Sequence, residues 1–366
     1  DSRAFVVYTR LFMDNPSTAQ PDAPSAAAPP IGRVAVGDCL ALMATWPEDS
    51  VDLVFADPPY NIGYDYDQYD DRRDDADYVA WTRDWVDACA RLLKPTGSMY
   101  ILIGDEYAAE TRLHLKQLER EGRLVFRNWI VWHYTFGQNC RSKFNRSHAH
   151  LFYVVGSDAH ASSGVKWKAT DPPFAFNREA IAVPSARQTT YADARANPKG
   201  KLPDDTWYLR PQDAEADGQL AYFTPDQDTW YLSRLCGTFR ERVGWHPCQL
   251  PEALLERIVK LSSNPGDVVF DPFVGSGTTL TVAALHGRRW LGCEMSEEYA
   301  EKATQRIRYA EQHGRSPRTT QAERGLDRKN PKKKPEPKRS ASPPAVDSGP
   351  QATPDLSLFS HGGSGG

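Results

Sequence analysis

Short apolar runs alternate with amphipathic stretches along residues 33–155. The clearest run is 51–56, VDLVFA, which has the length and the nearly continuous apolar character of a strand buried on both faces. Residues 77–93 then place Val79, Trp85 and Leu92 at helical spacing, and the sequence KPTG at 94–97 ends that pattern. By the same criteria we expect strands at 33–36, 51–56, 98–103, 124–133 and 150–155, and helices at 40–46, 77–93 and 107–120.

A second block with the same alternation follows at residues 251–294. Pro251 begins a helix, and the sequence NPG at 264–266 ends it. A strand at 267–270, a helix reaching His286 and a strand at 289–293 form one βαβ unit. Because these strands need neighbours, we predict one doubly wound, mostly parallel α/β sheet of the Rossmann-like kind, with residues 156–242 as an insertion beside it.

Composition separates both ends of the chain from its middle. The first thirty residues end in PDAPSAAAPP, and residues 311–340 carry ten Lys or Arg against four Asp or Glu in a proline-rich stretch. We therefore predict disordered segments at 1–30 and 311–366 around a folded domain at 31–310. The basic tail has two open interpretations, a segment that attracts phosphates and a solvated segment that aids solubility.

Cysteine spacing and hydropathy narrow the class of protein. The six cysteines include no Cys-x-x-Cys pair, so neither a zinc ribbon nor a disulfide framework is indicated, and we expect no metal. No apolar run approaches the ~20 residues that a membrane-spanning helix needs, and a secretory signal pattern is absent. We expect a cytoplasmic protein.

The strand at 51–56 runs directly into Asp57, two prolines and Tyr60. Pro58 and Pro59 cannot donate to a sheet ladder, so the strand stops there and a stiff backbone holds the acid and the ring at its carboxyl end. Such stiffness favours a functional site.

A glycine turn, Gly275-Ser276-Gly277, stands between the strand and the helix of the second block. Glycines let a ligand approach the backbone, and Glu294 lies 17 residues beyond Gly277, near the interval of about 20 at which an acid accepts from ribose hydroxyls. The third glycine of a dinucleotide fingerprint is missing, which disfavours a pyrophosphate cofactor. The alternative is a tight turn beside an ordinary surface acid.

Asp57-Pro58-Pro59-Tyr60 together with FVGSG at 273–277 resembles the paired signature of the DNA amino-methyltransferases that use S-adenosylmethionine. The tetrapeptide precedes the glycine turn, an order that resembles the β-class of this family. GDC at 37–39, DTW at 228–230 and HPCQLPE at 246–252 are smaller matches, and the resemblance spans about 34–308. It implies the methyltransferase fold with permuted motif order, and a target-recognition role for the insertion at 156–242.

The resemblance also implies roles for individual residues. Asp57 and the carbonyl of Pro58 would accept from the exocyclic amino group of a flipped base, Pro59 would stiffen the loop, and Tyr60 would stack on the base. Asp57 is also expected to contact the methionine part of S-adenosylmethionine. The remaining cofactor contacts implied are Asp38, Cys39, His246, Phe273, Gly275, Ser276, Gly277, Thr278 and Glu294.

Two segments imitate catalytic motifs. The sequence DPPF at 171–174 repeats the tetrapeptide, but the polar stretch KWKAT before it predicts no buried strand. Pro247-Cys248 resembles the nucleophile of enzymes that methylate a ring carbon, but the companion Glu-Asn-Val is absent. We assign neither of them to catalysis.

The stretch from Trp132 to His148 leaves a strand and becomes a basic loop interleaved with aromatic residues. Its basic members suit phosphates, while its aromatic and amide members could fill or probe the gap left by a flipped base. Ordinary loop packing is the alternative. The candidate DNA-binding residues are Phe136, Gln138, Asn139, Arg141, Lys143 and Arg146.

The sequence thus predicts a site-specific DNA methyltransferase that acts on N6 of adenine by direct transfer. Cytosine N4 is the first alternative, and a non-catalytic DNA-binding regulator, a nicotinamide dehydrogenase and an RNA substrate are the others. Double-stranded DNA is the expected partner, in the cytoplasm with the nucleoid, and the resemblance favours a homodimer. The target sequence, the presence of a restriction partner and the role of the basic tail are not encoded in recognisable motifs.

Overall fold

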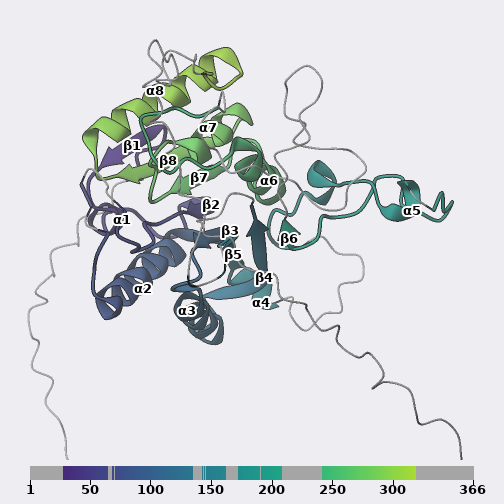
Figure 1. Ribbon diagram of the computed structural model, residues 1–366, viewed down its shortest axis with the longest axis horizontal. Coiled ribbons are helices and arrows are strands. Elements are labelled where there is room, and N and C mark those ends of the chain that lie inside the picture. The colour runs from purple at the N-terminus through teal and green to yellow at the C-terminus, as the bar shows by residue number, and fades with distance from the viewer. Residues whose placement is uncertain are drawn as a thin grey trace, which may run out of the picture. The chain divides into compact units, whose positions relative to one another are not determined.

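Eight strands in the described part of the chain form one sheet (Figure 1). The computed structural model describes residues 28–64, 68–69, 71–134, 142, 144, 146–161, 172–189, 191–207 and 241–318. The strands are β1 (Arg33–Val36), β2 (Val51–Ala56), β3 (Leu93–Ile103), β4 (Leu124–His133), β5 (His148–Gly156), β6 (Thr206–Trp207), β7 (Val268–Asp271) and β8 (Arg289–Glu294).

The strand order is β1-β8-β7-β2-β3-β5-β4-β6. Only β5 runs against its neighbours β3 and β4, and the other adjacent pairs are parallel. Strands β7 and β8 of the second sequence block lie between β1 and β2 of the first block. The prediction of one composite, mostly parallel sheet is therefore confirmed.

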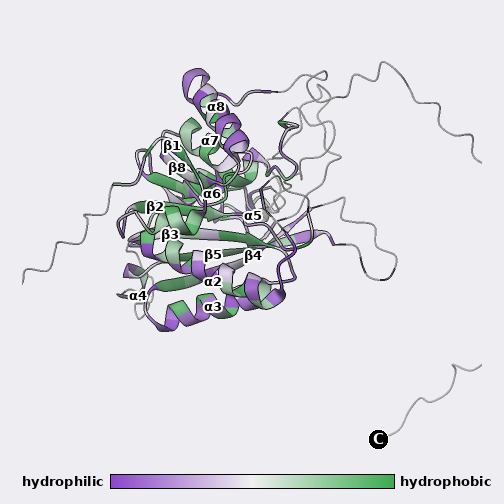
Figure 2. Ribbon diagram, turned by 90° about the vertical axis from the view of Figure 1, so that its left-hand side faces the viewer, coloured by the Kyte–Doolittle hydropathy of each residue, from purple (hydrophilic) through white to green (hydrophobic). Residues whose placement is uncertain are grey.

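Helices cover both faces of this sheet, α2 and α3 on one side and α7 and α8 on the other (Figure 1). Side chains alternate along each strand, so Leu53 and Phe55 enter one apolar core while Val54 and Ala56 enter the other. In Figure 2 the central strands are largely hydrophobic, as strands buried on both faces must be. The helices are α1 (Cys39–Met43), α2 (Asp75–Leu92), α3 (Ala108–Arg120), α4 (Asp158–Ala161), α5 (Ala186–Thr189), α6 (Glu252–Ser262), α7 (Thr278–Leu285) and α8 (Glu297–His313), with a 3₁₀ turn η1 (Arg178–Ile181).

The predicted bounds of β2 and β4 are correct, but β3 begins earlier than predicted. It starts at Leu93, which pairs with Val51, and residues 94–97 form its first part instead of a loop. The register shifts between Val51 and Leu53, and the Lys94 ammonium lies 2.7 Å from the Asp52 carboxylate. A register shift of this kind has no signature in the hydropathy pattern.

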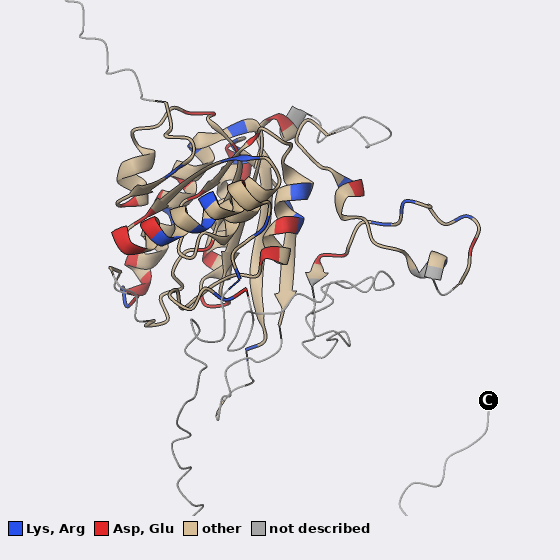
Figure 3. Cartoon of the chain, turned by 90° about the horizontal axis from the view of Figure 1, so that it is seen from above, with Lys and Arg blue, Asp and Glu red and all other residues tan. Residues whose placement is uncertain are grey.

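Helix α8 is absent from the elements predicted from the sequence. Ser296 caps its first turn by accepting from the Tyr299 N–H, and Gly314 ends it in the left-handed region at φ 62°. Its buried positions are Ala300, Ala303, Arg306, Ile307 and Ala310, and because three of them are alanine and one is arginine, their apolar periodicity is weak. In Figure 3 the helices around the sheet carry acidic and basic residues side by side.

The predicted domain bounds remain predictions. Residues 1–27, 208–240 and 319–366 lie outside the described residues, as does Asp171 of the DPPF segment. Within the predicted insertion, β6 adds to the sheet edge beside β4, and Phe174 and Ile181 pack into the core. None of the helices in the described ranges is both long and apolar enough to cross a bilayer.

Candidate active site

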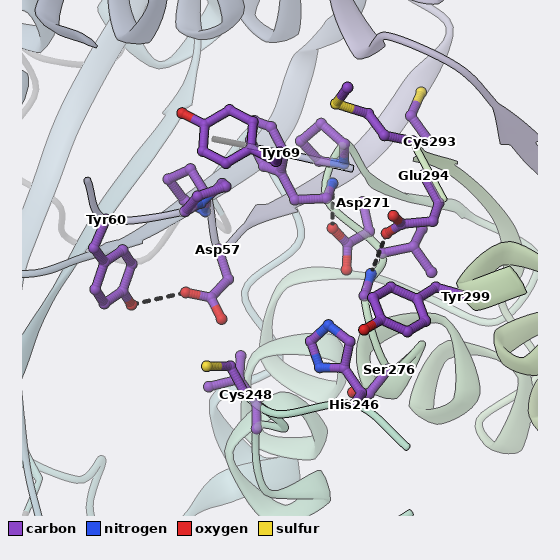
Figure 4. A pocket seen from close by; sticks show the side chains of 18 of the residues that line it. Asp57, Tyr60, Tyr69, His246, Cys248, Asp271, Ser276, Cys293, Glu294 and Tyr299 are labelled. Atoms are coloured by element: carbon purple, nitrogen blue, oxygen red, sulfur yellow. Dashed lines mark hydrogen bonds between the residues drawn. The ribbon is translucent and has the colours of Figure 1, made fainter. Parts of the chain in front are cut away.

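The sheet reverses its winding between β7 and β2, which are neighbours. From β7 the chain continues through α7 to β8 on one side, and from β2 it continues through α2 to β3 on the other. Ligands of open α/β sheets bind at such a switch point, beyond the carboxyl ends of the strands. A cavity of about 340 Å³ opens there (Figure 4).

The cavity brings together most of the residues singled out from the sequence. Asp57, directly after β2, and Glu294, at the end of β8, both line it, as does Phe273 of the glycine-turn segment. The other predicted residues that line it are Asp38, Cys39, Pro58, Pro59, Tyr60, His246, Gly275, Ser276 and Thr278. Segments more than 200 residues apart in the sequence therefore share one cavity.

Asp57 and Tyr60 form a hydrogen-bonded pair inside the cavity. The Tyr60 hydroxyl donates to Asp57 Oδ1 at 2.7 Å (Figure 4). Burial raises the pKa of Asp57 to about 7, and the hydrogen bond from Tyr60 opposes that rise only in part. Burial and the neighbouring carboxylate raise the pKa of Tyr60 well above its usual value, so the phenol keeps its proton. The pair can present a carboxylate and an aromatic face together.

A buried carboxylate, Asp71, holds the loop that follows the tetrapeptide. Asp71 is 1% exposed and accepts from the backbone N–H groups of Asn61 at 2.7 Å, Ile62 at 3.1 Å and Tyr64 at 2.9 Å. These bonds fix Asn61 at φ 56°, in the left-handed region that asparagine tolerates. These hydrogen bonds therefore hold the loop at residues 57–64 in addition to the stiffness that its two prolines provide.

Two tyrosines support the same loop from the helices behind it. The Tyr78 hydroxyl donates to the Pro59 carbonyl at 2.6 Å, and the Asn61 amide donates to the Tyr107 hydroxyl at 2.8 Å. No hydrogen bond to the Pro58 carbonyl is found among the described residues.

We expect Asp71→Ala to lower kcat about 10²-fold, because a displacement of the Tyr60 loop by roughly 1 Å is enough for such a loss. The melting temperature should change by only a few degrees, since the loop lies outside both cores. Steady-state kinetics and thermal melting test this result. Asp74→Ala is the matched control, because exposed Asp74 makes no side-chain cap bond. Equal kinetics for the two variants would contradict the role of Asp71 in holding the Tyr60 loop.

The glycine turn reaches the cavity at Gly275. Its φ is 47°, and a Cβ there would lie 2.9 Å from the His246 ring, so only glycine fits. The Gly275 N–H donates to Glu294 Oε2 at 2.8 Å (Figure 4). The Ser296 N–H donates to Glu294 Oε1 at 3.0 Å. The Glu294 carboxylate is thus held in place by the turn and by the beginning of α8.

Gly277, predicted to contact the cofactor, is not among the residues that line the cavity. Its φ is 75°, its N–H donates to the Val274 carbonyl at 2.8 Å, and a Cβ would lie 2.9 Å from the Ala303 side chain. The second glycine therefore serves the turn and the close packing of α8.

Asp271, at the end of β7, is a carboxylate that the sequence reasoning did not select. It is 3% exposed, lines the cavity and accepts from the Phe273 N–H at 2.9 Å. Burial raises its pKa to about 7, and the charges of Asp57 and Glu294 add to that rise. Its position directly before the glycine turn is the sequence feature by which it could have been selected.

Aromatic side chains that the sequence did not single out complete the cavity wall. Tyr69 and Trp81 lie on one side, with the Arg73 guanidinium 4.9 Å from the centroid of each ring. Trp132 and Tyr134 line the cavity as well and pack edge to face with ring centroids 5.4 Å apart. The cavity therefore offers aromatic side chains on which a flat ligand can stack.

Burial also shifts the pKa of two further groups of the cavity, His246 and Cys39. Burial lowers the pKa of His246 to about 4 and raises the pKa of the Cys39 thiol to about 12. Neither group is therefore charged near pH 7. Cys248, whose role as a nucleophile the sequence analysis rejected, also lines the cavity.

The predicted DNA-binding residues are only partly described. Arg146 is paired with two acids that follow β3, its Nε lying 2.8 Å from Asp105 Oδ1 and its Nη2 donating to Glu106. Phe136, Gln138, Asn139, Arg141 and Lys143 lie outside the described residues. No group of His, Cys, Asp and Glu in the described part of the chain could hold a metal ion.

The chain matches known proteins over most of its length. The family model described as DNA methylase matches residues 51–305. The chain is 30% identical over 275 residues to the Type II methyltransferase M.HpaI of Haemophilus parainfluenzae, covering 75% of this chain and 74% of that protein. It is 31% identical over 279 residues to the DNA adenine methyltransferase YhdJ of Escherichia coli (strain K12), covering 74% and 81%.

Among solved structures, the complex of M1.HpyAVI with SAM aligns with 75% of this chain and 98% of its own, at 22% identity and a TM-score of 0.46. The match of the family model covers both the tetrapeptide and the glycine turn. The chain therefore belongs to the N6/N4 DNA methylase family.

Proposed function

We propose that the protein is a site-specific DNA methyltransferase that moves a methyl group from S-adenosylmethionine to N6 of an adenine flipped out of double-stranded DNA. The observation that supports this most is the shared cavity. It holds an acid and a ring, Asp57 and Tyr60, together with a glycine turn whose Gly275 is bonded to Glu294. Membership of the DNA methylase family supports the same reaction class.

The residues of the cavity fit S-adenosylmethionine. The turn at Gly275 packs so closely against the His246 ring that a Cβ there would lie 2.9 Å from it, and both residues line the cavity. Four acidic residues, Asp38, Asp57, Asp271 and Glu294, line the cavity, and Arg73 is the one lysine or arginine among its described lining residues. An acidic cavity suits a cation. Glu294 would hold the ribose hydroxyls, and Phe273 and Gly275 the methionine part.

When bound, S-adenosylmethionine supplies an electrophilic methyl group on a sulfonium. The residues of this chain prepare the acceptor. An exocyclic amino group is a poor nucleophile, because its lone pair is delocalised into the ring. Asp57 and the Pro58 carbonyl would accept from its two N–H bonds and so favour a pyramidal nitrogen with higher electron density. Tyr60 would stack on the base.

The choice of adenine over cytosine follows from the first residue of the tetrapeptide. Asp57 resembles the adenine enzymes, whereas cytosine-N4 enzymes more often carry serine there. One relative, YhdJ, is named a DNA adenine methyltransferase. Cytosine N4 is the second candidate, because its amino group would meet the same two acceptors.

The test is to incubate the protein with DNA and labelled S-adenosylmethionine and to digest the product to nucleosides. We expect the label in 6-methyladenine. Label found only in 4-methylcytosine would overturn the choice of base, and no transfer to any DNA would overturn the reaction. Methylation-sensitive sequencing of a host that expresses the chain would then give the target site.

The rate should depend on pH through Asp57. Only its carboxylate accepts from the amino group, and its pKa is about 7. We therefore expect kcat/KM for the cofactor to be constant above pH 8 and to fall about tenfold per unit below pH 7. Asp271 titrates in the same range and can steepen this limb. A profile that stays flat from pH 8 to 5 would contradict the assignment.

A further inference from the structure

Arg306 of α8 is buried against the glycine turn without reaching the cavity. It is 4% exposed, and its Nη1 donates to the Ser276 carbonyl at 2.9 Å and to the Thr278 hydroxyl at 3.0 Å. Both of these turn residues line the cavity. The guanidinium thus lies behind Ser276 and Thr278 and supports the part of the cavity wall that would face the cofactor.

The other arm of Arg306 reaches the end of the segment at residues 241–252, part of which lines the cavity. Its Nη2 donates to Glu252 Oε1 at 2.8 Å, and Glu252 is the first residue of α6. The Glu252 N–H in turn donates to Glu241 Oε1 at 2.6 Å, and the Gln249 amide donates to the Glu241 carbonyl at 2.9 Å. His246 and Gln249 of this segment line the cavity.

Close packing brings the arginine within reach of the turn. The Ala303 side chain stands so near Gly277 that a Cβ at Gly277 would lie 2.9 Å away. Arg306 follows Ala303 by three residues, so both project from the same face of α8. One face of α8 therefore sets how closely the glycine turn approaches this helix, through Ala303, and how the turn is oriented, through Arg306.

We propose that Arg306 is a positioning residue of the cofactor site, which fixes the glycine turn and the segment at residues 241–252 at a set separation. Arginine suits this role because its planar fork can donate to the turn and to Glu252 at once, whereas a lysine ammonium is a single point charge. The inference rests on the proposed function, because it assumes that this turn holds S-adenosylmethionine.

The test compares Arg306→Lys and Arg306→Met with the wild-type protein, at a temperature well below melting. We expect Kd and KM for S-adenosylmethionine to rise roughly tenfold in Arg306→Lys and further in Arg306→Met, with kcat at saturating cofactor within about threefold. Arg288→Lys is the matched control. Arg288 also donates to backbone carbonyls, those of Ser263 and His286, but lies beyond the other end of α7 and does not line the cavity.

A double-variant cycle tests whether Arg306 and Glu252 act as one unit. Glu252→Gln should raise Kd for the cofactor as well, and adding it to Arg306→Lys should raise Kd little further. Fully additive effects, or a lower melting temperature in Arg306→Lys with an unchanged Kd, would overturn the inference. Failure of the wild-type protein to bind S-adenosylmethionine would instead overturn the proposed function, and the inference with it.

Discussion

Replacing Asp57 by asparagine is expected to lower kcat by about 10²–10³-fold or more, the usual cost of removing a group that stabilises charge in the transition state. The amide introduced at this position keeps one acceptor oxygen, but it replaces the other by an NH2 donor and carries no negative charge. Cofactor binding should weaken far less, because the glycine turn and Glu294 are untouched. Single-turnover methyl transfer gives the rate, and calorimetry with S-adenosylhomocysteine gives the affinity.

Two further variants sharpen the assignment of Asp57. Asp77→Asn makes the same chemical change on the exposed first turn of α2 and should leave the rate unchanged. Asp57→Ala should be at least as slow as Asp57→Asn, because it leaves the Pro58 carbonyl as the remaining acceptor. Undiminished transfer by Asp57→Ala would show that the proposed chemistry is wrong.

Glu294→Ala should weaken binding of S-adenosylmethionine by about 10–100-fold. Hydrogen bonds to a charged group contribute about 1.5–3 kcal/mol, and this carboxylate would hold the ribose while it accepts from Gly275 and Ser296. With saturating cofactor, kcat should recover to within several-fold. Equilibrium dialysis with labelled cofactor and a KM series measure the two quantities separately.

The control for Glu294 is Glu297, three residues later in the first turn of α8 and exposed. Glu297→Ala should leave the affinity within about twofold. If Glu294→Ala lowers kcat but leaves Kd and KM for the cofactor unchanged, the ribose role of Glu294 is wrong, and its hydrogen bonds only support the turn.

Features of the fold that depend on short-range pattern could be predicted from the sequence. VDLVFA at 51–56 is apolar at every position but Asp52, and the structure buries it between two layers of helices. Asp57 and Glu294 could be predicted as site residues for the same reason, because Asp57 directly follows such a strand and Glu294 ends one. Parallel strands present their carboxyl ends at one edge, which is how two distant motifs come to share a cavity.

Features that depend on long-range geometry could not be predicted. Asp71 stands in the acidic stretch YDDRRDDAD, and nothing local separates it from its neighbours. Only the folded loop shows that it turns inward to accept from Asn61, Ile62 and Tyr64. Gly277 was assigned to the cofactor from a motif, whereas its close contact with Ala303 needs α8 in place.

The central claim is that the Asp57–Tyr60 pair and the glycine turn serve one reaction inside one cavity. A crystal structure of the protein with S-adenosylhomocysteine tests it most directly. We expect the ribose hydroxyls at Glu294 and the sulfur facing Asp57 across the cavity, with the ligand passing over Gly275. A ligand bound at another surface, or one whose sulfur faces away from Asp57, would contradict the account.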